Sequence, residues 1–236
     1  MTVLSDTALA QPANRAGKPW RAILFDLDGT LVDSAPDLAG AGNEMRAVRG
    51  LPLLPLLHFR PMVGTGARGM VEQALGVLST DLEFGSLRDE FLERYEARMT
   101  HDTVLFPAIA ALLTGLRQRG LPWAIVTNKA SRFSVPLVAS FDALADAATL
   151  VSGDTTAHSK PHPAPLLEAA RRMAIDPARC VYVGDDLRDV QAGAAAGMAT
   201  VAVRWGYLGA GESIDHWGAD YVIDSPTDLL KLLAIA

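Results

Sequence analysis

The sequence predicts an α/β fold, in which a Rossmann-like parallel sheet core carries an inserted all-helical cap domain. Two observations predict it. Short apolar runs alternate with helical patterns over most of the chain, and a long helical stretch interrupts this alternation after the first run. The chain has 236 residues, half of them hydrophobic, so either one large domain or two small ones could form a sizeable core.

Six short apolar runs, each followed by polar or glycine residues, are the predicted strands. They are rich in Val and Ile and lack polar alternation, which is typical of strands buried on both faces of a parallel sheet. The runs cover residues 22–25, 123–128, 149–154, 180–186, 199–206 and 220–224.

Helical patterns accompany these runs at residues 108–120, 163–173, 187–198 and 225–236. The first ends in basic residues and Gly120, which favours a helix C-terminus, and the second follows a proline start. Strands that alternate with helices predict right-handed crossovers and a parallel sheet.

The alternation stops after the first strand, where residues 36–50, 67–76 and 86–99 all have helical patterns. In the last of these, Leu87, Phe91, Tyr95 and Met99 recur every four residues, and we expect this stripe to pack against other helices. The predicted organisation is a flexible tail at 1–17, a catalytic core at 18–36 and 106–236, and a helical cap domain at 37–105.

Composition excludes several classes of partner. A net charge of −6 and a pI near 5.3 argue against nucleic acid, and no run approaches the roughly 18 apolar residues that a membrane helix needs. The single cysteine, Cys180, cannot form an internal disulfide, which fits the cytoplasm, and its apolar surroundings predict a core residue. We expect a monomer or a homodimer.

Polar residues that carry chemistry follow the predicted strands. Because ligands of open α/β sheets bind outside the carboxyl ends of the strands, we expect these side chains to meet at one rim. Four separate segments supply them: Asp26 and Asp28; Thr127 and Asn128; Lys160; and Asp185, Asp186 and Asp189.

This set of residues suits phosphoryl transfer. Asp26 and Asp28 would repel each other unless a cation or a proton relieved the repulsion. Mg²⁺ prefers a few carboxylate oxygens plus phosphate and water, and a carboxylate can attack phosphorus. A second carboxyl can move the proton of the leaving alcohol. Lys160 and Thr127 could bind phosphate oxygens, and amides near Gly29 could add an anion-binding turn.

Simpler interpretations stand beside this one. A calcium loop is disfavoured because Leu31 occupies the position where an EF-hand needs glycine, and because a strand precedes the motif. Asp186 and Asp189 could merely cap a helix that begins near Leu187. The G-x-G-x-x-G pattern at residues 64–69 is flanked by helices rather than by a βαβ unit, so we expect a flexible cap loop and not a dinucleotide site.

The segments "DLDGTLVDS", "VTN", "SKPHP" and "VGDDLRD" resemble, in order, the four motifs of the haloacid dehalogenase superfamily of phosphatases. The resemblance implies that Asp26 is the nucleophile and Asp28 the general acid/base. It implies phosphate binding by Thr127, Asn128, Lys160 and Gly29. It also implies a Mg²⁺ cofactor bound by Asp26, Asp185 and the Asp28 carbonyl, with Asp186 and Asp189 in or near its outer coordination sphere.

Two branches of that superfamily suggest a small phosphorylated metabolite as substrate. "VGTGARGMVEQALG" and "VTNK" resemble bacterial phosphoglycolate phosphatases, whereas "RWGYLG" and "HWGADYVIDSP" are similar to enzymes that act on N-acetylmuramic acid 6-phosphate. Both substrates carry a carboxylate, and Arg68 is the predicted cap residue that binds it; the alternative is a surface arginine. A sugar phosphomutase and a non-catalytic binding module are the other functional alternatives.

Overall fold

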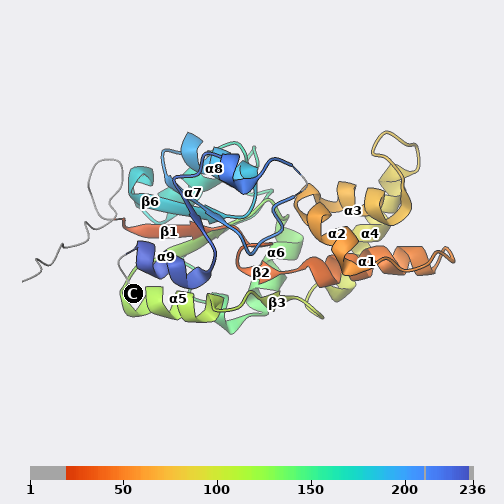
Figure 1. The fold of residues 1–236 in the computed structure, drawn as a ribbon, viewed down its shortest axis with the longest axis horizontal. Helices are drawn as coiled ribbons and strands as arrows, with labels where there is room; N and C mark the ends of the chain where they lie inside the picture. Colours follow the sequence, from red (N-terminus) through yellow and green to blue (C-terminus); the bar gives the residue numbers. More distant parts are fainter. Residues whose placement is uncertain (1–19, 210, 234–236) are drawn as a thin grey trace, which may run out of the picture.

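The structure is a computed structural model that describes residues 20–209 and 211–233. Its fold is built on a six-stranded parallel sheet (Figure 1). All six predicted strands are present, some shorter than expected, and the predicted α/β class is confirmed. Their order in the sheet is β5-β4-β1-β6-β7-β8. The strands are β1 (Ala22–Phe25), β4 (Trp123–Val126), β5 (Leu150–Val151), β6 (Cys180–Gly184), β7 (Ala199–Val203) and β8 (Tyr221–Ile223).

The central strand β1 lies between β4 and β6, where the direction of strand addition reverses. Such a switch point opens a crevice at the carboxyl ends of the strands, and ligands of doubly wound sheets bind there. Side chains of β1 alternate between two buried clusters: Ile23 and Phe25 face one, and Ala22 and Leu24 face the other. The first candidate residue, Asp26, therefore follows directly from a fully buried central strand.

Helices cover both faces of the sheet. One face carries α7 (Ala164–Arg172) and α8 (Leu187–Ala195), whose small residues pack on β4, β5, β6 and β7. The opposite face carries α5 (Ile109–Gln118), α6 (Ser131–Ala139) and α9 (Pro226–Leu232). Helix α6 was not predicted, and Pro136 lies within it. Short 3₁₀ turns complete the core at Asp142–Leu144, Pro177–Arg179 and Ile214–His216.

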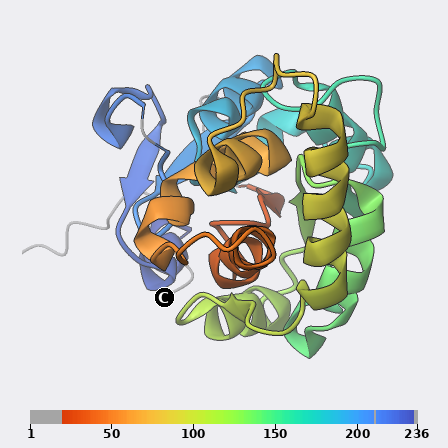
Figure 2. The ribbon, with the colours of Figure 1, turned by 90° about the vertical axis from the view of Figure 1, so that its right-hand side faces the viewer.

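The helical insert (residues 37–105 in the predicted organisation) lies beyond one end of the sheet, next to the carboxyl end of β1. It contains α1 (Ala35–Ala47), α2 (Leu56–Phe59), the 3₁₀ helix η1 (Arg60–Thr65), α3 (Gly66–Leu75) and α4 (Phe84–Arg98). Helix α1 packs against α3 and α4 (Figure 2). The stripe Leu87, Phe91, Tyr95 and Met99 is buried, as the sequence predicted. The pattern at 64–69 is not a flexible loop, because it lies in η1 and α3.

A two-stranded antiparallel ribbon stands where the chain enters and leaves the insert. It pairs β2 (Val32–Asp33) with β3 (Val104–Leu105), and two residues per strand are too few to give a sequence signal. Buried Asp37, in the first turn of α1, accepts hydrogen bonds from the amides of Asp102 and Thr103 and from the Thr103 hydroxyl. The two segments that connect the core to the helical insert are therefore held together by the β2–β3 pairing and by the hydrogen bonds of Asp37.

Two remaining expectations concern Cys180 and the tail. Cys180 is buried at the start of β6, and burial raises the pKa of its thiol to about 12, as befits a core residue. The predicted tail at 1–17 lies outside the described residues. Within the described part of the chain, every helix is too short or too polar to cross a membrane.

Candidate active site

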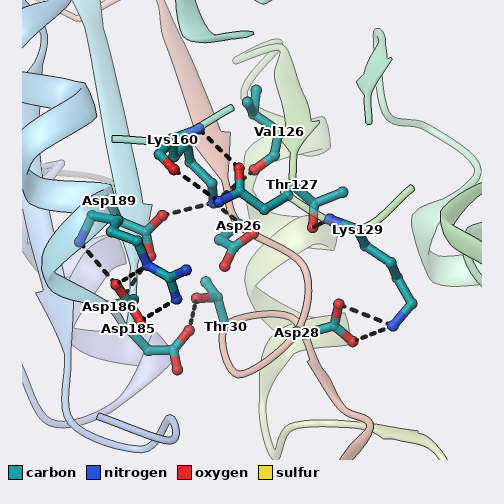
Figure 3. A network of polar contacts seen from close by, with 12 residues as sticks. Asp26, Asp28, Thr30, Val126, Thr127, Lys129, Lys160, Asp185, Asp186 and Asp189 are labelled. Carbon is teal, nitrogen blue, oxygen red and sulfur yellow. Dashed lines mark hydrogen bonds and ion pairs between the residues drawn. The ribbon is translucent and has the colours of Figure 1, made fainter. Parts of the chain in front are cut away.

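The predicted site residues meet at the carboxyl end of β1 (Figure 3). Asp26 follows β1, Thr127 follows β4 and Asp185 follows β6, while Lys160 reaches the same place from the segment before α7. A cavity of about 320 Å³ opens between this rim and the helical insert. Residues that are far apart in the sequence thus share one site, as the strand pattern predicted.

Lys160 is the central cation of the site. Its side chain is buried, and its Nζ lies 2.8 Å from Asp26 Oδ1 and 2.7 Å from Asp189 Oδ1, with a further hydrogen bond to the Tyr182 hydroxyl. Burial disfavours the ammonium, but the charges of Asp189 and Asp26 raise the pKa of Lys160 above its ordinary value. Lys160 is therefore a fixed positive charge beside the proposed nucleophile.

Three carboxylates form a cluster that fits a divalent cation. Oxygens of Asp26, Asp185 and Asp189 lie within 4.8 Å of one another; the side chains of Asp185 and Asp189 are buried, and that of Asp26 is 13% exposed. Burial and the charge of Asp189 raise the pKa of Asp26 to about 7, despite the opposing charge of Lys160. Burial and the charges of Asp26 and Asp189 raise the pKa of Asp185 well above its ordinary value. A bound Mg²⁺ would relieve this repulsion, and carboxylate oxygens are its preferred protein ligands.

Asp185 is held in a close-fitting cradle. Its carboxylate accepts hydrogen bonds from the Thr30 hydroxyl (2.9 Å) and from the Tyr207 amide (2.8 Å). A Cβ at Gly29 would lie 2.1 Å from Asp185 Oδ2, and one at Gly206 would lie 2.2 Å from Asp185 Cβ. These contacts fix the carboxylate before any ligand arrives.

Gly29 differs from the expectation of phosphate binding. Its amide donates a 2.9 Å hydrogen bond to the Val32 carbonyl, so that N–H is already used within the turn. Its φ of 89° and its close approach to Asp185 explain why glycine stands here. The structure thus supports a role for Gly29 in shaping the turn and not in binding the phosphate through its amide.

Asp28 forms an ion pair with a second lysine, Lys129. Lys129 Nζ donates to both carboxylate oxygens, at 3.0 and 3.2 Å, and the Ser34 hydroxyl donates to Oδ1. The carboxylates of Asp26 and Asp28 point to different partners, Lys160 and Lys129 respectively (Figure 3). The expected repulsion between the two aspartates is therefore relieved by two lysines, and the sequence analysis had assigned no role to Lys129.

Thr127 and Asn128 behave differently from each other. Thr127 lines the cavity, and its hydroxyl accepts a hydrogen bond from the Lys129 amide. Both polar ends of the Asn128 side chain bond the main chain of Lys160, at 2.9 and 3.0 Å. The Asn128 side chain thus positions Lys160. The predicted contact between Asn128 and phosphate would therefore have to come from the main chain of Asn128, and this contact remains a prediction.

Asp186 and Asp189 form a capping box at the start of α8. Asp186 caps the helix and pairs with Arg188, whose hydrogen bonds lower the pKa of Asp186 although burial opposes this shift. Asp189 accepts from the Asp186 amide and from Lys160, and it belongs to the carboxylate cluster. The capping interpretation is therefore confirmed for both residues, while Asp189 alone of the two also belongs to the carboxylate cluster.

Arg68 does not line the cavity. It lies exposed on α3, and the arginine that lines the cavity is Arg188, whose guanidinium also bonds the Gly64 carbonyl. The structure thus favours the surface interpretation of Arg68. Lys129, Arg188 and Tyr207 were missed because no sequence pattern separates them from surface residues of the same types, and only the fold shows that they line the cavity.

Comparisons with known proteins agree with this geometry. Residues 23–203 match the family described as haloacid dehalogenase-like hydrolase. The chain is 41% identical over 213 residues to the N-acetylmuramic acid 6-phosphate phosphatase of Pseudomonas aeruginosa, covering 90% of this chain and 94% of that protein. It is 43% identical over 209 residues to the phosphoglycolate phosphatase of Xanthomonas campestris pv. campestris, covering 89% and 94%.

A solved structure shares the fold. It is a predicted phosphoglycolate phosphatase from Haemophilus somnus, with a TM-score of 0.80 and 29% sequence identity, and the match covers 90% of this chain and 97% of that one. The matches cover 94% to 97% of the length of these relatives and about 90% of this chain. The similarity therefore includes the helical insert as well as the sheet.

Proposed function

The chain belongs to the haloacid dehalogenase-like hydrolase family, and we propose that it is a Mg²⁺-dependent phosphatase that acts through an aspartyl-phosphate. The observation that carries the proposal is the cluster of Asp26, Asp185 and Asp189, with Lys160 paired to Asp26 and Asp189. This cluster combines a nucleophile, a cation site and a fixed positive charge at one point.

The first chemical step falls to Asp26 and Asp28. A carboxylate oxygen of Asp26 attacks the phosphorus, the bond between phosphorus and the ester oxygen breaks, and Asp28 gives a proton to the departing alcohol. Lys160 and the Thr127 hydroxyl hold phosphate oxygens during this transfer. The two carboxylates bond separate lysines, Lys160 and Lys129 (Figure 3), which suits attack on phosphorus by one and proton transfer by the other.

In the second step, Asp28 accepts a proton from water, which attacks the phosphorus and releases phosphate and free Asp26. Asp26, Asp185 and the Asp28 carbonyl would hold Mg²⁺, which would supply positive charge against the carboxylates and the phosphate. Thr30 and Tyr207 keep Asp185 in place for that ion through the hydrogen bonds described above.

The proposed substrate is a small phosphate ester that carries a carboxylate. We name 2-phosphoglycolate first, in agreement with the name of the Xanthomonas relative. N-Acetylmuramic acid 6-phosphate is the second candidate, and the cavity favours it in one respect. About 320 Å³ with a largely apolar wall exceeds what a two-carbon acid fills, and it approaches the volume of pockets for much larger ligands.

A phosphate-release screen tests the proposal. Purified protein is incubated with 2-phosphoglycolate, N-acetylmuramic acid 6-phosphate and common sugar phosphates, with Mg²⁺ or with EDTA. We expect phosphate release from a carboxylated ester that requires Mg²⁺. Isomerised sugar phosphate in excess of free phosphate would indicate a phosphomutase instead, and no turnover of any ester would contradict the proposal.

A further inference from the structure

The two lysines divide the site into two halves. Lys160 contacts Asp26 and Asp189, where the phosphoryl group and the cation are proposed to bind. Lys129 contacts Asp28, which in the proposed function protonates the departing alcohol. The surroundings of Lys129 are therefore the leaving-group half of the cavity, where the organic part of the substrate must lie.

Tyr95 is an unusual residue of this half. It extends from α4 in the helical insert, lines the cavity, and has only 2% of its surface exposed. Among the described residues, its hydroxyl has no partner in good hydrogen-bond geometry, and its nearest polar neighbour is the Lys129 ammonium, which is close enough to affect its pKa. A buried hydroxyl without a partner costs roughly 1–3 kcal/mol, so buried polar groups of this kind call for a specific explanation.

A bound ligand would explain it. Lys129 Nζ lies 4.6 Å from the centre of the Tyr95 ring, so a cation and a hydroxyl share one wall of the cavity. Burial raises the pKa of Tyr95 to about 12, although the Lys129 charge opposes the shift, and the phenol thus remains a hydrogen-bond donor near neutral pH. A donor next to a cation matches a carboxylate, whose oxygens only accept.

The rest of this wall is apolar. Phe91 and Leu92 of α4 and Phe133 of α6 line the cavity around Tyr95. They offer carbon surface to the body of a substrate and no competing hydrogen bond to its polar end. The Tyr95 hydroxyl and the Lys129 ammonium are therefore the hydrogen-bond donors beside this apolar surface, and the Asp28 carboxylate lies next to them on Lys129.

We propose that the Tyr95 hydroxyl donates a hydrogen bond to the carboxylate of the substrate, beside the Lys129 ammonium that also bonds Asp28. Tyr95 thereby takes the specificity role that the sequence analysis assigned to Arg68. This inference rests on the proposed function, because it requires turnover of a carboxylated phosphate ester. It adds the residue that separates such esters from uncarboxylated ones.

The test compares Tyr95→Phe with the wild type on matched pairs of esters. One pair is 2-phosphoglycolate and ethyl phosphate, and the other is N-acetylmuramic acid 6-phosphate and N-acetylglucosamine 6-phosphate; in each pair only the first carries a carboxylate. Tyr221→Phe is the control variant, because Tyr221 lies on β8, packs on Trp20 and does not line the cavity. Where an uncarboxylated ester turns over too slowly, its inhibition constant replaces kcat/KM.

We expect Tyr95→Phe to lower kcat/KM for the carboxylated ester about tenfold or more, since hydrogen bonds to charged groups are stronger than neutral ones. The uncarboxylated partner should change less than about twofold, as should both esters in Tyr221→Phe. The melting temperature of free Tyr95→Phe should not fall, because the variant removes only a hydroxyl without a partner in good hydrogen-bond geometry.

The possible failures are distinguishable. If the wild type hydrolyses no ester, the proposed function fails, and this inference fails with it. If the wild type prefers carboxylated esters but Tyr95→Phe keeps that preference, only the role of Tyr95 is overturned. An equal loss on both members of a pair would also overturn it, because that result indicates a structural role.

Discussion

The pKa of Asp26 gives a quantitative prediction for the metal-free protein. Burial and the charge of Asp189 raise this pKa from 3.8 to about 7 in the folded state, while an unfolded chain would restore the ordinary value. The folded protein therefore holds a proton on Asp26 that the unfolded protein has already lost across this interval of pH. Folding stability must then decrease as the pH rises from about 4 to about 7.

The size of the effect follows from the shift. About three pKa units at roughly 1.4 kcal/mol each correspond to about 4 kcal/mol for Asp26, of which about 2–3 kcal/mol is lost between pH 5 and 7. Asp26→Asn keeps the shape of the side chain and removes the titrating group. Its free energy of unfolding should therefore decline less with pH than that of the wild type.

The assay is urea unfolding followed by circular dichroism, in EDTA, at intervals from pH 5 to 7.5. Asp146→Asn is the control, because Asp146 forms an exposed ion pair with Arg117, and such pairs contribute little. Adding Mg²⁺ should restabilise the wild type, by about 2.7 kcal/mol at a hundredfold excess over its dissociation constant, and Asp26→Asn by less. Parallel pH curves for the wild type and Asp26→Asn would refute the reasoning.

Three further substitutions test other parts of the structure. Asp37→Ala should destabilise the protein by roughly 3 kcal/mol, because it leaves the buried donors of Thr103 without an acceptor; thermal unfolding measures this, and a change below about 1 kcal/mol would contradict it. Asn128→Ala should lower kcat but leave the melting temperature nearly unchanged, because it removes two hydrogen bonds to the main chain of Lys160 and creates no cavity in the hydrophobic core; an unchanged kcat would contradict a positioning role for Asn128. Arg68→Ala should leave kcat/KM within about twofold on carboxylated and uncarboxylated esters alike, and a selective loss on carboxylated esters would restore the original assignment.

The sequence was informative where the fold depends on repeated patterns. Strand β1 and the other five strands of the sheet were visible because strands buried on both faces are short, continuous apolar runs. The ribbon of β2 and β3 was invisible because each strand has only two residues, and its pairing joins segments about 70 positions apart. Helix α6 was overlooked, and Pro136 within it weakens the helical pattern.

Within the site, the sequence located residues better than it located their partners. Asp26 and Asp185 could be placed at the rim because each directly follows a strand. The contact between Lys129 and Asp28 could not, because it depends on the side chains of two neighbouring strand ends turning toward each other. The position of Arg68 could not be predicted either, because a helix pattern alone did not show which face of α3 meets the cavity; Arg68 is exposed and is not among the lining residues.

The most direct test of the central claim is to trap the covalent intermediate. The enzyme is mixed with 2-phosphoglycolate or N-acetylmuramic acid 6-phosphate and Mg²⁺, quenched in acid within one turnover, reduced with borohydride and digested for mass spectrometry. Reduction converts an aspartyl-phosphate to homoserine, so we predict homoserine at position 26 and an unchanged aspartate at position 28. Rapid hydrolysis without any label at Asp26, or a label at Asp28 instead, would contradict the proposed mechanism.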